Sequence, residues 1–158
     1  MRLRELQITY KPVAGIPPGP RPRLTTPDSA AALLAPLLET EAVEVFGMLL
    51  LNTKLEPLAW HVLSRGTLDA TLVHPRDAIK AACLGNAAAV VVGHNHPSGD
   101  PEPSAADIAA TLRLREAFAL VGVDLVDSII IGSAGRWCSI RNRGLLVGAH
   151  LGTVPGIR

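Results

Sequence analysis

The sequence is poor in aromatic residues and in cysteine, and each shortage excludes a class of protein. Aromatic side chains make up 3% of the 158 residues, too few for the stacked aromatic surface that binds single-stranded nucleic acid. The two cysteines, Cys83 and Cys138, lie far apart and form no C-x-x-C pair, which argues against a disulfide framework and against a thiolate zinc site. We therefore expect both cysteines to be buried as small hydrophobic side chains.

Long hydrophobic runs are also absent, although 48% of the residues are hydrophobic. No apolar run approaches the roughly 18–20 residues that cross a bilayer. The N-terminal residues MRLRELQITYKPV lack the apolar core of a signal peptide. The sequence therefore predicts a soluble, cytoplasmic protein without membrane contact. Its length is typical of one domain, and its hydrophobic content excludes wholesale disorder.

Acidic residues are scarce at both ends of the chain, although the net charge is only +1. Residues 1–24 carry five basic side chains and one acidic side chain, and residues 136–158 carry four arginines and no acidic side chain. Short basic segments attract phosphates, so weak contact with nucleic acid through these termini is one interpretation. Solvated charge on loose termini is the other.

Proline is concentrated near the N-terminus, where it marks an arm that precedes the folded domain. Seven of the thirteen prolines lie in residues 10–36. Because proline lacks an N–H donor and restricts the residue before it, the segment VAGIPPGPRPR within this stretch disfavours helix and central strand. We predict a proline-rich basic arm over residues 1–25, a folded domain over 26–146 and a C-terminal tail over 147–158. The arm straps its own domain, binds a partner, or exchanges with a second copy to form a homodimer.

Alternating strand and helix patterns predict an α/β domain with a mixed β-sheet flanked by helices. Thr26-Pro27 is typical of a helix N-cap followed by proline at the first helical position. The predicted helices cover 27–39, 75–86 and 104–121. The predicted strands cover 44–52, 57–64, 68–73, 87–93, 123–131 and 136–140. The loop HNHPSGDPEP is expected to follow the strand over 87–93.

The stretch HNHPSGDPEPSAAD carries the clearest chemical signal. His94 and His96 are two residues apart, so in extended backbone both imidazoles point to one side and can occupy adjacent corners of a tetrahedral metal. Asp107 lies in the first turn of the next predicted helix, and a proline-stiffened loop can return it as a third ligand. Two histidines and a carboxylate with a fourth position for water form a catalytic zinc arrangement, although the set also suits iron or manganese.

Each half of this stretch has a simpler interpretation. H-x-H occurs in solvated turns, and Ser104-Ala-Ala-Asp107 is also a capping box at the start of a helix. The two motifs joined at fixed spacing after an apolar strand favour the metal site. The capping interpretation can hold together with the zinc interpretation, because one helix start can serve both.

The joined pattern H-x-H-P-x(6)-S-x-x-D resembles the JAMM metalloprotease motif of the JAB/MPN domain family. More narrowly, HNHPSGDPEPSAAD is similar to the bacterial RadC branch of that family, as are EVFGMLLLNTK, RGTLDATLVHPRDAIKAA, NAAAVVVGHNHPSGD and RWCSIRNRGLL. The resemblance covers about residues 26–146. It implies a single domain of the JAB/MPN, cytidine-deaminase-like fold.

The resemblance also implies a role for each site residue. His94, His96 and Asp107 match the zinc ligands, for one zinc per chain. Ser104 matches the serine that helps to hold the oxyanion. Glu44 matches the glutamate that acts through the zinc-bound water, first as general base and then as acid to the leaving amine. The residues alone leave a wider choice, and only Glu44 directly abuts the apolar strand among the candidates Glu39, Glu41, Glu44 and Glu56.

Three functions are compatible with these features. The first is a zinc-dependent hydrolase that cleaves a peptide or isopeptide bond in a peptide or protein. The second is a nucleic-acid-associated DNA repair factor of the RadC type or a metal-dependent nuclease, but the arm is too short for the helix-hairpin-helix region that RadC proteins usually carry. The third is a non-catalytic MPN scaffold, against which the complete motif counts. A cytidine deaminase would need H-x-E and P-C-x-x-C, and both motifs are absent.

Overall fold

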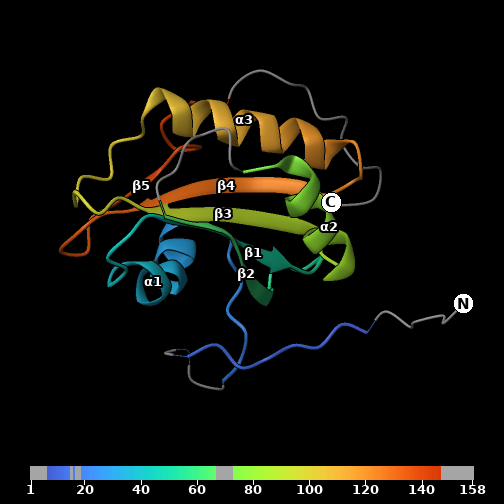
Figure 1. The fold of residues 1–158 in the computed structure, drawn as a ribbon. Helices are drawn as coiled ribbons and strands as arrows, with labels where there is room; N and C mark the ends of the chain where they lie inside the picture. Colours follow the sequence, from blue (N-terminus) through green and yellow to red (C-terminus); the bar gives the residue numbers. More distant parts are fainter. Residues whose placement is uncertain (1–6, 15, 17–18, 67–72, 147–158) are drawn as a thin grey trace, which may run out of the picture.

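A computed structural model of the protein describes residues 7–14, 16, 19–66 and 73–146 (Figure 1). The helices and strands alternate along the chain, as the hydrophobic pattern predicts. Their order is α1 (Pro27–Leu38), β1 (Val45–Leu51), β2 (Pro57–Arg65), α2 (Pro75–Leu84), β3 (Ala89–Asn95), α3 (Ala105–Ala119), β4 (Asp124–Ile131) and β5 (Trp137–Ser139). No helix in the described part of the chain is long and apolar enough to span a membrane.

The strands form one mixed sheet in the order β2-β1-β3-β4-β5. β1 is antiparallel to both β2 and β3, and β4 is antiparallel to β5. β3 and β4 are parallel because α3 carries the chain back between them. The prediction of a mixed sheet flanked by helices is therefore confirmed.

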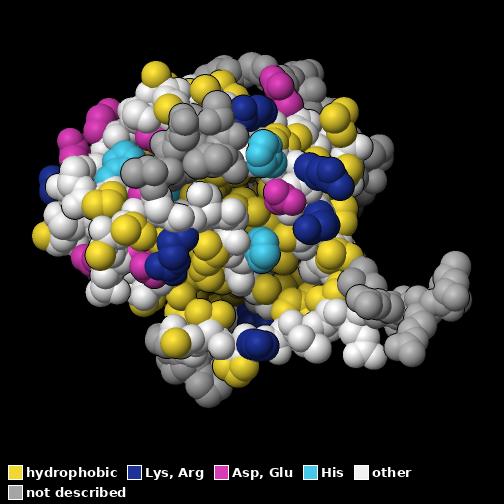
Figure 2. Space-filling view, viewed as in Figure 1, with side chains coloured by type: hydrophobic (Ala, Val, Ile, Leu, Met, Phe, Trp, Pro, Cys, Tyr) yellow, Lys and Arg dark blue, Asp and Glu magenta, His cyan; other side chains and the backbone are white. Residues whose placement is uncertain are grey.

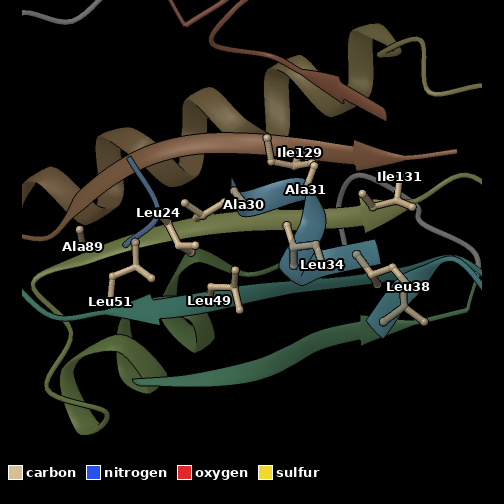
Figure 3. Packing of buried hydrophobic residues seen from close by; sticks show 12 residues of the cluster. Leu24, Ala30, Ala31, Leu34, Leu38, Leu49, Leu51, Ala89, Ile129 and Ile131 are labelled. Atoms are coloured by element: carbon tan, nitrogen blue, oxygen red, sulfur yellow. The ribbon is translucent and has the colours of Figure 1, made fainter. Parts of the chain in front are cut away.

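Helices cover both faces of the sheet, with α1 on one face and α2 and α3 on the other (Figure 1). The side chains of β1 alternate between these faces, so Leu49 packs against the α1 side and Met48 against the α2 and α3 side. Figure 3 shows the cluster on the α1 face, where Leu34 and Leu38 meet the sheet. This double cover explains why β1 and β3 are buried along their whole length.

Two details differ from the sequence predictions, and a third prediction falls mostly outside the described residues. β3 continues through His94 and Asn95, which the prediction placed in the following loop; pairing with β1 and β4 keeps both residues in the sheet. Cys138 is buried, but Cys83 is exposed, because α2 buries Ala78 and Ala82 instead. The strand predicted over 68–73 lies outside the described residues except for Val73, which belongs to no strand.

The described part of the arm lies against the domain and is hydrogen-bonded to it. Tyr10 donates a hydrogen bond from its hydroxyl to the carbonyl of Gly85 at 3.1 Å, and the Leu24 N–H donates to the carbonyl of Leu55 at 2.9 Å. Figure 2 shows hydrophobic side chains gathered in the lower part of the view, next to the arm. The domain boundaries at 25 and 146 remain predictions, and the tail over 147–158 lies outside the described residues.

Candidate metal centre

The end of β3 brings two imidazoles together on the α2 and α3 face of the sheet. His94 is fully buried and stacks on Phe46, with ring centroids 5.5 Å apart. His96 is two residues further along and more open to solvent. Their Nε2 atoms lie 3.1 Å apart, as the H-x-H spacing predicts for extended backbone.

The start of α3 supplies the carboxylate. Ser104 is the N-cap: its hydroxyl accepts a hydrogen bond from the Asp107 N–H, and the Asp107 carboxylate accepts one from the Ser104 N–H at 2.8 Å. The same carboxylate lies 3.3 Å from Nε2 of His94 and 3.4 Å from Nε2 of His96. The capping box is therefore present, and it holds Asp107 toward the two histidines.

Glu44 completes the cluster from the residue just before β1. The antiparallel register pairs Phe46 with His94, so its continuation places Glu44 opposite His96. One ligand atom from each of Glu44, His94, His96 and Asp107 lies within 4.8 Å of the others. The structure therefore brings together the four side chains that the sequence analysis names, and their individual roles remain predictions.

The other candidate glutamates have partners elsewhere. Glu39 accepts a hydrogen bond from the Gly135 N–H at 3.2 Å, and Glu41 accepts one from the Arg65 guanidinium at 2.9 Å. Glu56 accepts one from the Asn52 amide at 2.9 Å. The structure therefore singles out Glu44 among the candidates that the sequence leaves open.

The hydrogen bonds of the two histidines fit a cation between them. Nδ1 of His96 donates to the carbonyl of Asp100 at 2.7 Å; because a carbonyl only accepts, Nδ1 carries the proton and Nε2 of the neutral ring offers a lone pair. Nδ1 of His94 is buried and has no hydrogen-bond partner among the described residues. The two Nε2 atoms are 3.1 Å apart, close to the edge of a tetrahedron, about 3.3 Å, for bonds of about 2.0–2.1 Å. Each faces a different oxygen of Asp107, Oδ1 at 3.3 Å from His94 and Oδ2 at 3.4 Å from His96.

The electrostatics of the cluster agree with this arrangement. Burial by itself raises the pKa of Asp107, but hydrogen bonds from His94, His96 and Ser104 together outweigh it and hold that pKa far below its ordinary value. The hydrogen bond to Asp107 raises the pKa of His96, although burial opposes it. Without a metal, the carboxylate is charged and favours a proton on His96. A divalent cation that replaces this proton keeps the carboxylate paired.

A small cavity adjoins the cluster. It has a volume of about 150 Å³ and lies between Glu44, Ser104, Phe46 and Ala110. The Ser104 hydroxyl donates to the Asp107 carboxylate at 2.6 Å and is one of the polar groups along the cavity wall. Its expected contact with an oxyanion remains a prediction.

The sequence did not reveal the groups that hold the loop after His96. The Gly99 carbonyl accepts hydrogen bonds from the Ser133 N–H at 3.0 Å and from the Arg136 guanidinium at 2.8 Å. This ties the loop carrying Asp100 to the turn between β4 and β5, and Asp100 in turn orients His96. Residue 99 favours glycine, since its φ is +80° and an added Cβ would overlap the side chain of Ser133. No local motif reports such a contact between distant segments.

Comparisons with known proteins show the family of this chain. The family model of the RadC-like JAB domain matches residues 24–145. Relatives called UPF0758 proteins are 46% identical over 121 residues in Xanthomonas campestris pv. campestris and 42% identical over 127 residues in Methanosarcina acetivorans. These matches cover 77% and 80% of this chain but 53% and 55% of the relatives, so the chain spans about half of their length. With its five-stranded mixed sheet and three flanking helices, the chain belongs to the RadC-like JAB domain family.

Proposed function

We propose that the protein is a zinc-dependent hydrolase that cleaves an amide bond, of the peptide or isopeptide kind, in a peptide or protein. The observation that carries the proposal is the convergence of His94, His96 and Asp107 at 3.1–3.4 Å with Glu44 beside them. The complete set favours an enzyme over a non-catalytic scaffold, because a scaffold has no need of four converging polar side chains at the end of a buried strand.

Zinc fits this set of ligands better than a hard cation does. His94 and His96 would hold it through Nε2, and Asp107 through a carboxylate oxygen. Imidazole suits zinc, whereas magnesium and calcium prefer an all-oxygen shell. When bound, zinc polarises a carbonyl and lowers the pKa of a water molecule, which supplies a nucleophile near neutral pH.

The protein's own residues then divide the remaining work. Glu44 accepts a proton as water adds to the carbonyl carbon, and returns it to the amide nitrogen as the C–N bond breaks. Ser104 lies at the cavity wall, where its hydroxyl can turn from Asp107 to donate to the oxyanion. The small cavity between Glu44 and Ser104 admits a narrow segment of chain at the reacting bond.

Metal content tests the site before any substrate is known. Protein purified without added metal, then offered zinc and freed of excess, should hold about one zinc per chain. His96→Ala should lose most of it, because an open site retains few ligands. His61→Ala is the matched control, since His61 lies on β2 outside the cluster. Wild type without zinc would overturn the proposal.

Hydrolysis tests the reaction itself. A library of blocked peptides and of Lys-linked isopeptides is incubated with the zinc-loaded protein, and the new amino groups are measured. Glu44→Gln should keep the zinc and lower the rate by about 10²–10⁴-fold, because it removes the proton carrier. A zinc-loaded wild type that cleaves neither class would contradict the substrate assignment.

A further inference from the structure

Asn95 lies between the two histidines, yet its side chain points to the opposite face of the sheet. It is the last residue of β3 and is 3% exposed. Because side chains alternate along a strand, His94 and His96 face the metal centre and Asn95 faces away from it. The H-x-H motif itself leaves the residue between the histidines without a role.

The Asn95 amide is bonded to the segment that carries Glu44. Its Oδ1 accepts a hydrogen bond from the Val45 N–H at 2.8 Å. Its Nδ2 donates to the carbonyl of Val43 at 3.0 Å and to the carbonyl of Glu41 at 3.4 Å. The amide is therefore hydrogen-bonded to the backbone on both sides of Glu44.

A residue next to β2 holds Glu44 itself. The Gly66 N–H, just after β2, donates to the carbonyl of Glu44 at 2.9 Å. The Glu44 carbonyl is thus held by Gly66, while Asn95 holds the residues on either side of Glu44. Only an amide provides the acceptor and the two donors that these three backbone groups require, since a carboxylate would place an oxygen against the two carbonyls.

We infer that Asn95 is a positioning residue, which fixes the carboxylate of Glu44 beside the metal centre through the backbone of residues 41–45. Its two neighbours in sequence hold the metal. The inference rests on the proposed function, since it assumes a metal at this centre. It adds that the H-N-H tripeptide places both the ligands and the acid–base residue.

The chain contains a matched control at the other end of β1. Asn52 also makes three hydrogen bonds: its Oδ1 accepts from the N–H groups of Lys54 and Glu56 at 2.8 and 3.0 Å, and its Nδ2 donates to the Glu56 carboxylate. It shapes the turn between β1 and β2. Asn52→Asp therefore changes the same chemical group, far from the metal centre.

The test uses Co²⁺ in place of zinc, because its visible absorption reports ligand exchange, and acetohydroxamate as the probe. A hydroxamate chelates the metal through two oxygens and gives its proton to a nearby carboxylate. Glu44→Gln and Asn95→Asp should each still bind one Co²⁺. Each should weaken acetohydroxamate binding by about tenfold or more, the size of loss that follows mutation of residues just outside a metal's ligands. The double variant should be no weaker than Glu44→Gln alone. Asn52→Asp should bind as wild type does.

Each alternative outcome has a distinct meaning. Wild type that binds no Co²⁺ or zinc would overturn the proposed function together with the inference. Co²⁺-loaded Asn95→Asp with wild-type affinity for acetohydroxamate, additive losses in the double variant, or no loss in Glu44→Gln would overturn the inference alone. If Asn95→Asp does not fold, Asn95→Ala replaces it, because it removes the amide without adding a charge. If Asn95→Asp and Asn95→Ala both fold but neither binds the metal, Asn95 supports the site as a whole. That result would also overturn the inference.

Discussion

Asp127 and Asp107 are both shielded carboxylates, but their partners differ in kind. Asp127 lies on β4, beside Leu24 and Ala30 on the α1 side of the sheet. It accepts three hydrogen bonds, from the Ser139 hydroxyl at 2.6 Å, the Ser128 N–H at 2.7 Å and the Arg141 N–H at 3.1 Å. Asp107 faces two imidazole Nε2 atoms on the other side of the sheet.

The difference in partners distinguishes a carboxylate that serves the structure from one that is placed to bind a metal. The donors around Asp127 are fixed by the backbone and by a serine, so they are satisfied without any added ion. The ring atoms around Asp107 can exchange a proton for a metal. Burial raises the pKa of Asp127 although its hydrogen bonds oppose the change, whereas the histidines and Ser104 lower the pKa of Asp107 against its burial. A shielded aspartate therefore indicates a metal site only when its neighbours are themselves ligands.

The largest expected contrast is in zinc binding by the two isosteric variants. Asp107→Asn should weaken zinc binding by at least about 100-fold, because it replaces an anionic ligand by a neutral amide. Asp127→Asn should bind zinc as wild type does, since the substituted residue lies across the sheet from the ligands. Competition with a chromophoric chelator measures both affinities. Equal losses in the two variants would contradict the distinction.

The stability of the zinc-free protein should show the reverse order. Asp127→Ala should lower the free energy of unfolding by about 2–4 kcal/mol, because it leaves buried donors without an acceptor. Asp107→Ala should lower it by about 1 kcal/mol, because it removes one half of the capping box of α3. Urea denaturation in the presence of a chelator measures both. A larger loss in Asp107→Ala would assign that residue a structural role first.

The contrast also separates what the sequence can predict from what it cannot. Residue spacing within one segment predicted that His94, His96 and Asp107 come together, since H-x-H in extended backbone and S-x-x-D at a helix start are local geometries. The apolar runs and caps predicted α1, α3 and β1 within one or two residues, and the mixed sheet with them. Local rules of this kind need no knowledge of the rest of the chain.

Contacts between distant segments could not be predicted in the same way. Asn95 reads as a loop residue in the sequence, and only the pairing of β3 with β1 places its amide on residues 41–45. The three donors of Asp127 come from its own strand and from the segment around β5. Nothing in one sequence reports these pairings. They depend on strand order and register, which the hydrophobic pattern leaves open.

The smallest expected effect is in the pH dependence of stability, and it has opposite signs for the two aspartates. The folded-state pKa of Asp127 is raised above its ordinary value of 3.8, so its contribution is present below pH 3.8 and is lost as pH rises through the folded-state pKa. The folded-state pKa of Asp107 is lowered. Its contribution is present above pH 3.8 and is lost as pH falls through the folded-state pKa.

His96 sets the upper end of the pH range over which Asp107 contributes to stability. The folded-state pKa of His96 is raised from an ordinary value of 6.5, so its favourable pairing with Asp107 is lost as pH rises through that raised pKa. In zinc-free protein, the stability lost in Asp107→Asn should therefore be greatest between about pH 4 and 6.5 and shrink on either side. The stability of wild type relative to Asp127→Asn should instead fall steadily as pH rises from below 4. Urea denaturation of both variants at about pH 3 and at about pH 6.5 measures the net change in each effect, which should be a rise for Asp107 and a fall for Asp127. Changes of the same sign would show that the two carboxylates differ in their partners but not in their electrostatic role.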